Sequence, residues 1–196
     1  MQEHHDDVYV LRARQEGYRS RAAYKLLEIN EKHRLLRPGM AIVDLGAAPG
    51  GWSQIAARHV GPGGRVIATD ILPMEALQNV EFVLGDFTEE TVYESLVAML
   101  GERRAGLVIS DMAPNSSGMK TVDQPRALYL AELALDMARR VLSPGGDFLV
   151  KVFQGAGSEQ FIKEIRGAFG KVVIVKPKAS RPKSREVYVL ARNYLV

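Results

Sequence analysis

Aspartates recur at or near the ends of four apolar segments in this chain of 196 residues. The four are Asp44, Asp70, Asp86 and Asp111. If the segments are neighbouring parallel strands, the carboxylates meet at the edge where open α/β sheets bind ligands. Capping of a following helix explains any single aspartate, but four in series favour an acidic binding edge. Such an edge suits a ligand with ribose hydroxyls, an amino group and positive charge.

The first apolar segment runs into a turn of glycine, alanine and proline, "GAAPGGW" over residues 46–52. A dinucleotide-binding turn needs Gly-x-Gly-x-x-Gly, whereas Ala48 occupies the second glycine position here. The turn also lacks the Gly-Lys-Ser/Thr ending of a nucleoside-triphosphate loop. A smaller, partly cationic ligand remains, and S-adenosylmethionine has the ribose, the adenine amino group and the charge that the acidic edge suits.

Lys151 is the clearest candidate for proton transfer, because it lies in the apolar segment "DFLVKVF". Burial of an ammonium is costly unless the group is paired or functional, and it favours the neutral amine that can act as a general base. Asp111 is the expected partner, with Lys25 and Glu186 as further members of the cluster. Such a base would deprotonate a ribose hydroxyl for in-line methyl transfer. The alternative is a strand-end lysine that extends into solvent.

An alternation of strands and helices must position these residues. Apolar runs predict strands at residues 40–46, 64–70, 80–86, 106–112, 146–153, 171–177 and 186–194. Helical spacing appears over residues 20–36, with Ser20 as the expected N-cap, and over 124–142. This order predicts an α/β fold with a mostly parallel sheet and helices on both faces. Residues 178–185 are too few for a parallel crossover, so the last strand is predicted to return antiparallel.

Length and composition indicate one domain over residues 1–196, and we expect residues 1–18 to be a partly mobile N-terminal extension. Cysteine is absent, which excludes disulfides and thiolate metal sites, and no metal is expected. No apolar run is long enough to span a bilayer and the N-terminus lacks signal-peptide features. We therefore expect a cytoplasmic protein that does not bind membranes.

The basic charge lies at the two ends of the sequence. Residues 1–37 carry 8 Lys/Arg and 6 Asp/Glu, residues 38–162 carry 9 and 15, and residues 163–196 carry 9 and 2. If both ends fold onto one face, that face suits RNA, whereas ordinary solvated charge is the alternative. The candidate RNA-binding residues are Arg19, Arg21, Lys25, Arg181, Lys183 and Arg185.

Several segments together resemble one known family. "RSRAAYKL", "VDLGAAPGGWSQ", "ATDILPM", "VLGDF", "SDMAPNSSG", "LVKVFQG" and "SREVYVLA" follow one another as in the FtsJ (RrmJ) heat-shock methyltransferases, from about residue 8 to 194. The resemblance implies a Rossmann-like S-adenosylmethionine-dependent fold of seven strands with an antiparallel last strand. It also implies 2′-O-methylation of a ribose, on a uridine of 23S ribosomal RNA within the 50S subunit, by a monomer.

The resemblance further assigns residues to roles. The family's catalytic tetrad falls on Lys25, Asp111, Lys151 and Glu186, with Lys151 as the proton acceptor. Its cofactor contacts fall on Gly46, Pro49, Gly50, Trp52, Asp70, Asp86, Phe87 and Asp111.

Two other functions stay open at this point. The first is a ribosome-assembly factor that binds RNA and for which catalysis is secondary. The second is a nicotinamide-dependent oxidoreductase, which Ala48 in the glycine-rich turn opposes.

Overall fold

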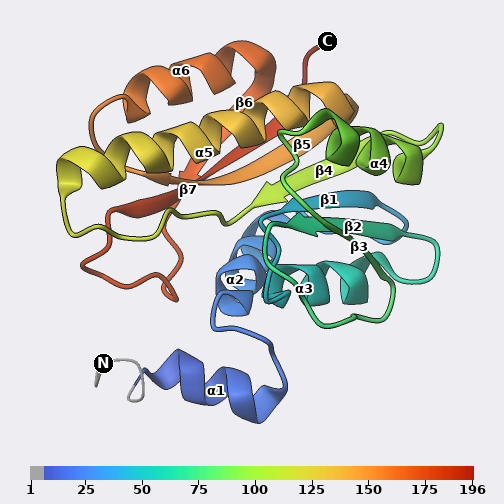
Figure 1. Cartoon of the computed structure of the whole chain (residues 1–196), viewed down its shortest axis with the longest axis horizontal. Coiled ribbons are helices and arrows are strands. Elements are labelled where there is room, and N and C mark those ends of the chain that lie inside the picture. Colours follow the sequence, from blue (N-terminus) through green and yellow to red (C-terminus); the bar gives the residue numbers. More distant parts are fainter. Residues whose placement is uncertain (1–6) are drawn as a thin grey trace.

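A computed structural model describes residues 7–196, and Figure 1 shows its central sheet with helices on both sides. The strands are β1 (Ala41–Leu45), β2 (Arg65–Asp70), β3 (Val80–Leu84), β4 (Ala105–Ser110), β5 (Leu142–Phe153), β6 (Phe169–Val175) and β7 (Glu186–Tyr194). They form one seven-stranded sheet in the order β3-β2-β1-β4-β5-β7-β6. All seven predicted strands are confirmed, as is the α/β class.

Six of the strands run in one direction, and β7 lies antiparallel between β5 and β6. The predicted antiparallel return of the last strand is therefore confirmed. The sequence did not indicate that β7 would also pair with β5. In that pairing Lys151 lies directly opposite Tyr188, and Phe153 lies opposite Glu186. The insertion of β7 thus brings a tyrosine and a glutamate beside the candidate base.

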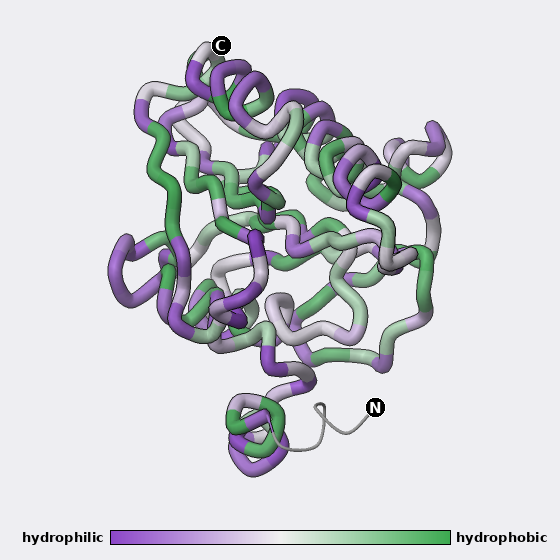
Figure 2. The backbone as a smooth tube through the Cα atoms, turned by 90° about the vertical axis from the view of Figure 1, so that its left-hand side faces the viewer, coloured by the Kyte–Doolittle hydropathy of each residue, from purple (hydrophilic) through white to green (hydrophobic). Residues whose placement is uncertain are grey.

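Helices cover both faces of the sheet, as predicted (Figure 1). The helices α2 (Ala23–His33) and α3 (Gly51–Val60) pack on one face. The opposite face is covered by α4 (Glu90–Leu100), α5 (Lys120–Val141) and α6 (Ser158–Ala168). Because helices cover both faces, every residue of β1 is buried. Strands buried on both faces need apolar residues at consecutive positions. Figure 2 shows hydrophobic residues along the interior strands.

The helix α1 (Val8–Glu16) lies beneath α2 in Figure 1. Asp7 caps it by accepting a hydrogen bond from the Tyr9 amide at 3.0 Å. The rings of Tyr9 and Tyr24 lie 5.5 Å apart, which joins α1 to α2. Of the predicted N-terminal extension, residues 1–6 lie outside the described residues, so its partial mobility stays a prediction.

Two helix starts differ from prediction. Ser20 is not the N-cap of α2, because that helix begins at Ala23 after a turn in which the Ala23 amide donates to the Ser20 carbonyl at 3.2 Å. The Ser20 hydroxyl instead lies against the start of α3, where a Cβ on Gly51 would come within 2.4 Å of it. The helix α5 begins at Lys120, four residues before the predicted start, and continues through Pro125.

Buried charged side chains gather at the carboxyl edge of the sheet. Of the five buried Asp, Glu and Lys residues in the described chain, only Asp147 lies elsewhere, and it pairs with Arg192 at 3.1 Å. The other four are Lys25, Asp44, Lys151 and Glu186. Buried charges are costly unless paired, so the burial of these side chains at this edge lowers the free energy of unfolding. Within residues 7–196, no helix is both long and apolar enough to cross a bilayer.

Candidate active site at the carboxyl edge of the sheet

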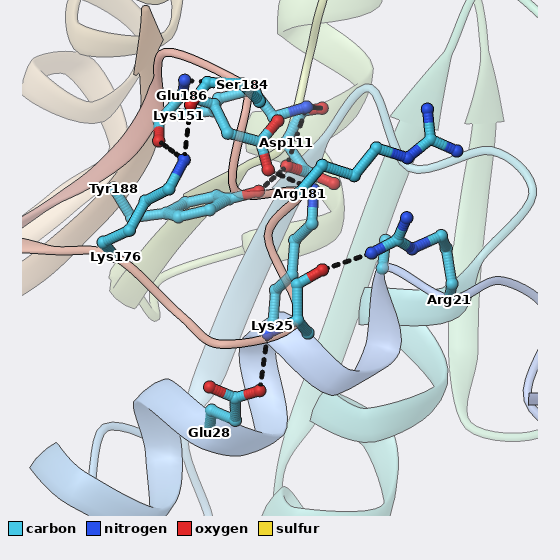
Figure 3. Close-up of polar contacts among 12 residues, drawn as sticks. Arg21, Lys25, Glu28, Asp111, Lys151, Lys176, Arg181, Ser184, Glu186 and Tyr188 are labelled. Carbon is cyan, nitrogen blue, oxygen red and sulfur yellow. Dashed lines mark hydrogen bonds and ion pairs between the residues drawn. The ribbon is translucent and has the colours of Figure 1, made fainter. Parts of the chain in front are cut away.

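Lys151 is held at two points by the residue that follows β4. Its Nζ lies 3.0 Å from Asp111 Oδ1 and donates to the Asp111 backbone carbonyl at 3.1 Å. The Tyr188 hydroxyl donates to the same Oδ1 at 2.5 Å. Lys151 is 9% exposed, so the amine is shielded but reachable. The end of β5 therefore presents one lysine amine in a fixed position at the edge of the sheet (Figure 3).

A second ion pair adjoins the first. Lys25 of α2 places its Nζ 2.6 Å from Glu186 Oε1, and both side chains are about one tenth exposed. Burial raises the pKa of Glu186, but Lys25 and Lys151 outweigh it, so the pKa lies below its ordinary value. Glu186 is therefore an anion at neutral pH. The structure thus brings together all four predicted catalytic residues in two adjacent ion pairs.

Tyr188 lies between the two ion pairs. Its ring centre is 5.8 Å from Lys25 Nζ and 5.6 Å from the Trp52 ring. Burial, and then the negative charge of Asp111 and Glu186, raise the pKa of Tyr188 well above 10. The phenol consequently keeps its proton and always donates to Asp111. Tyr188 is not among the predicted site residues, although its spacing of two residues from Glu186 in a strand places both side chains on one face.

The segment that precedes β7 is fastened through its backbone. Lys176 Nζ donates to the carbonyls of Ser184 and Glu186, at 2.8 and 2.6 Å. The Glu28 carboxylate accepts from the amides of Lys178 and Ala179, at 2.6 and 2.9 Å. Figure 3 shows these contacts next to the ion pairs. They fix the point at which Glu186 enters the sheet.

The glycine-rich turn after β1 is held by Asp70. The Ala48 amide donates to Asp70 Oδ2 at 2.9 Å, and the Leu72 amide donates to Oδ1 at 2.9 Å. Gly46 and Gly50 have positive φ angles of 70° and 108°, a conformation that glycine adopts without strain. A Cβ on Gly46 would lie 2.2 Å from Met112 Cγ. The turn therefore requires glycine for both its conformation and its close packing.

Asp44 lies beneath this turn and is 1% exposed. Burial raises its pKa to about 7, the hydrogen bond from Ser53 opposes the rise, and the charges of Asp111 and Asp70 add to it. Ser53 Oγ donates to Asp44 Oδ2 at 2.6 Å. Asp44 is thus largely uncharged below neutral pH and lies buried beneath the glycine-rich turn.

The other predicted cofactor residues lie around the same turn or farther along the edge. Asp86 and Phe87 follow β3 and are half-buried, and Asp86 Oδ1 accepts from the Thr88 amide at 2.9 Å. Trp52 is 3% exposed and donates from Nε1 to the Ala22 carbonyl at 2.8 Å. Its indole packs in the core between α2 and β7, so a contact with the cofactor stays a prediction. Pro49 is in the turn itself, and its carbonyl accepts from Arg19 at 3.2 Å.

Four of the six predicted RNA-binding residues form two groups, whereas Lys25 pairs with Glu186 and Arg19 donates to three backbone carbonyls. The guanidinium of Arg21 contacts Asp7 at 2.5 Å and the Ala179 carbonyl, while Arg181 lies 3.6 Å from Asp7. These two arginines help to join α1 to the segment before β7. Lys183 and Arg185 are exposed and line a pocket beside the ion pairs.

The acidic edge, the glycine-rich turn and the fixed lysine fit an enzyme that acts between a nucleoside cofactor and a second substrate. Residues 18–194 match the family described as FtsJ-like methyltransferase. The chain belongs to this family. The predicted family resemblance is therefore confirmed over nearly the whole chain.

Relatives of this FtsJ-like protein carry specific names. "Ribosomal RNA large subunit methyltransferase E" of Chromohalobacter salexigens is 62% identical over 194 residues, which cover 99% of this chain and 92% of the relative. The protein of the same name from Cellvibrio japonicus is 58% identical over 195 residues, covering 100% of this chain and 92% of the relative.

Solved structures agree with the fold. A putative ribosomal RNA methyltransferase from Plasmodium falciparum superimposes with a TM-score of 0.81 at 29% identity, covering 91% of this chain and 99% of its own. Human methyltransferase-like protein 13, solved in complex with SAH, has a TM-score of 0.58 at 16% identity, covering 89% of this chain and 82% of its own. The second likeness shows the fold alone.

The buried position of Asp44 predicts a pH-dependent stability. In the folded chain its carboxyl keeps a proton up to about pH 7, whereas the unfolded chain releases it near pH 3.8. The contribution of Asp44 to the free energy of unfolding therefore falls as pH rises through this window. The Asp44→Asn side chain has no proton to release in this range. The free energy of unfolding of Asp44→Asn minus that of wild type should therefore rise by about 2–4 kcal/mol from pH 4 to pH 8. Urea unfolding at both pH values measures this, and a difference that does not change with pH contradicts it.

Proposed function

We propose that this protein is an S-adenosylmethionine-dependent RNA methyltransferase that modifies a ribose 2′-hydroxyl of large-subunit ribosomal RNA. The observation that supports this most is the buried Lys151 amine, fixed by Asp111 at the edge that also carries the glycine-rich turn. The names of the relatives support ribosomal RNA of the large subunit as substrate.

The residues around the turn fit the cofactor. Asp70 and Asp86 are half-buried carboxylates at the ends of β2 and β3, positions at which ribose hydroxyls are bound in such folds. Glycine at positions 46 and 50 lets the turn after β1 adopt its positive φ angles without strain. When bound, S-adenosylmethionine supplies an electrophilic methyl group on a sulfonium.

Lys151 is the proposed general base. In its neutral form the Nζ amine accepts the proton of the ribose 2′-hydroxyl as that oxygen becomes a nucleophile, and Asp111 pairs with the ammonium that forms. Asp111 holds the amine at two points, and Tyr188 holds the Asp111 carboxylate. Lys25 pairs with Glu186, so the Glu186 carboxylate does not compete with Asp111 for the Lys151 amine. A positioned general base contributes roughly 10²- to 10⁴-fold to the rate.

RNA would lie over the basic residues near the same edge. Lys183 and Arg185 are exposed there, and contacts from such residues to phosphates position a nucleic acid without reading its sequence. The family resemblance extends the proposal to a uridine of 23S RNA within the 50S subunit, methylated by a monomer in the cytoplasm.

Arg19 serves the cofactor turn in this proposal, although its charge first indicated RNA. Its guanidinium donates to the carbonyls of Pro49, Glu75 and Ala76, at 3.2, 2.6 and 2.8 Å. It therefore ties the turn after β1 to the segment after β2. A Cβ on Gly50 would lie 2.9 Å from both Leu77 and Met74, which shows how closely the two segments pack.

Arg19→Ala should weaken cofactor binding about tenfold or more, because hydrogen bonds from a charged group contribute about 1.5–3 kcal/mol. RNA binding should stay close to wild type. Calorimetric titration with S-adenosylmethionine and filter binding of RNA separate the two effects, with Arg14→Ala as control because Arg14 is an exposed residue of α1. Lost RNA affinity with unchanged cofactor affinity contradicts this role.

Lys151→Ala should lower the rate of methyl transfer by about 10²-fold or more, with cofactor and RNA affinity retained. The assay uses labelled S-adenosylmethionine and 50S particles that lack the modification, and resistance of the labelled site to alkali identifies a 2′-O-methyl group. Lys171→Ala is the control, since Lys171 is an exposed lysine of β6. Transfer at the wild-type rate would exclude Lys151 as base. RNA and cofactor binding without transfer by the wild type would favour the RNA-binding assembly factor.

A further inference from the structure

A pocket of about 330 Å³ lies beside the ion pairs and has no role in the mechanism above. Its walls come from three segments that each adjoin a strand of the site. The first begins at Pro114, three residues after Asp111. The second is Phe153, two residues after Lys151. The third is Lys183 to Arg185, which leads directly into Glu186. The pocket is therefore a continuation of the active site, at the carboxyl ends of β4 and β5 and the start of β7.

The lining combines an apolar floor with a cationic rim. Phe153 and Ala127 supply carbon surface, whereas Lys120, Lys183 and Arg185 supply positive charge. Asp123 also lines the pocket, but its carboxylate is occupied by serine donors. It accepts from the Ser117 amide and hydroxyl, at 2.9 and 2.7 Å, and from the Ser116 hydroxyl at 3.2 Å. This combination suits an aromatic ring that carries phosphates.

The floor of the pocket is preformed. Gln124 Nε2 donates to the Phe153 carbonyl at 2.9 Å, which ties α5 to the end of β5. Gly155 packs closely against the same side chain, since a Cβ there would lie 2.8 Å from Gln124 Cδ. Binding at this surface therefore requires little ordering of the floor.

The pocket lies on the acceptor side of Lys151. The glycine-rich turn and Asp70 follow β1 and β2, on one side of β4 in the sheet, whereas Phe153 and Arg185 belong to β5 and the approach to β7, on the other side. The Phe153 ring centre is 5.9 Å from Lys151 Nζ. A group in this pocket would therefore approach Lys151 from the side opposite to the cofactor turn.

We propose that this pocket receives the base of the nucleotide whose ribose is methylated, with one face of the base on Phe153. This inference rests on the proposed function. A base is attached to the ribose carbon next to the one that bears the 2′-hydroxyl, so it must lie close to the hydroxyl that Lys151 deprotonates. Lys120, Lys183 and Arg185 would hold the flanking phosphates. The nucleotide would have to leave any helical stack, as it does in other enzymes that enclose a single nucleotide.

Substitution of Phe153 tests the stacking contact. Phe153→Leu should raise KM for 50S particles about tenfold, because the leucine side chain removes the aromatic face on which the base stacks. Phe153→Tyr keeps an aromatic face and should stay near wild type. The affinity for S-adenosylmethionine should be unchanged in both. Equal KM values for the leucine variant and wild type overturn the proposal.

A photo-crosslink tests the occupant directly and does not depend on turnover. The photoreactive residue p-benzoylphenylalanine replaces Phe153 or, as a control, Tyr129, an aromatic residue on α5 that is 59% exposed. Crosslinking from position 153 to the nucleotide that the wild type methylates supports the proposal. Crosslinks only to other nucleotides, or none above the Tyr129 control, overturn it. If the wild type transfers no methyl group to RNA, the proposed function itself has failed, which the assay with labelled cofactor reveals separately.

Discussion

The pairing of buried charge at one edge of the sheet is the constraint on which the site depends. Two lysines and one glutamate are less than one tenth exposed there, and unpaired burial of such groups would cost several kcal/mol each. In this structure Lys151 forms an ion pair with Asp111, and Lys25 forms one with Glu186. Removal of any one partner would leave a buried charge uncompensated. Side chains from α2, β4, β5 and β7 are therefore held to one geometry.

The antiparallel strand β7 makes this geometry possible. It enters the sheet at the same edge at which the parallel strands end, so Glu186 and Tyr188 lie beside Lys151 rather than at the far end of the sheet. Lys176 and Glu28 fasten the segment before it. The sheet thus separates two duties. The glycine-rich turn lies at the carboxyl ends of β1 and β2. The general base and the pocket beside it lie at the carboxyl ends of β4 and β5 and at the start of β7.

Much of the fold could be predicted because strands covered on both faces are apolar throughout, and such runs are visible in the sequence. Lys151 stood out for the same reason, as a charge inside an apolar run. Tyr188 and Lys176 did not, because their roles follow from the pairing of β7 with β5, which no local pattern reveals. The contacts of Arg19 could not be predicted either, since charge alone does not indicate that a guanidinium donates to three backbone carbonyls. Ser20 is a residue type that often caps helices, but its side chain packs against Gly51 at the start of α3 instead.

Tyr188 holds the Asp111 carboxylate in the position from which Asp111 holds Lys151. The most direct test is the single-turnover rate of methyl transfer by Tyr188→Phe at saturating cofactor and RNA. The phenylalanine ring keeps the contact with Trp52, so only the hydrogen bond to Asp111 is lost. Loss of a bond to a charged group should lower the rate about tenfold or more, with both binding affinities unchanged. A rate equal to that of wild type would contradict the claim that this hydrogen bond positions the base.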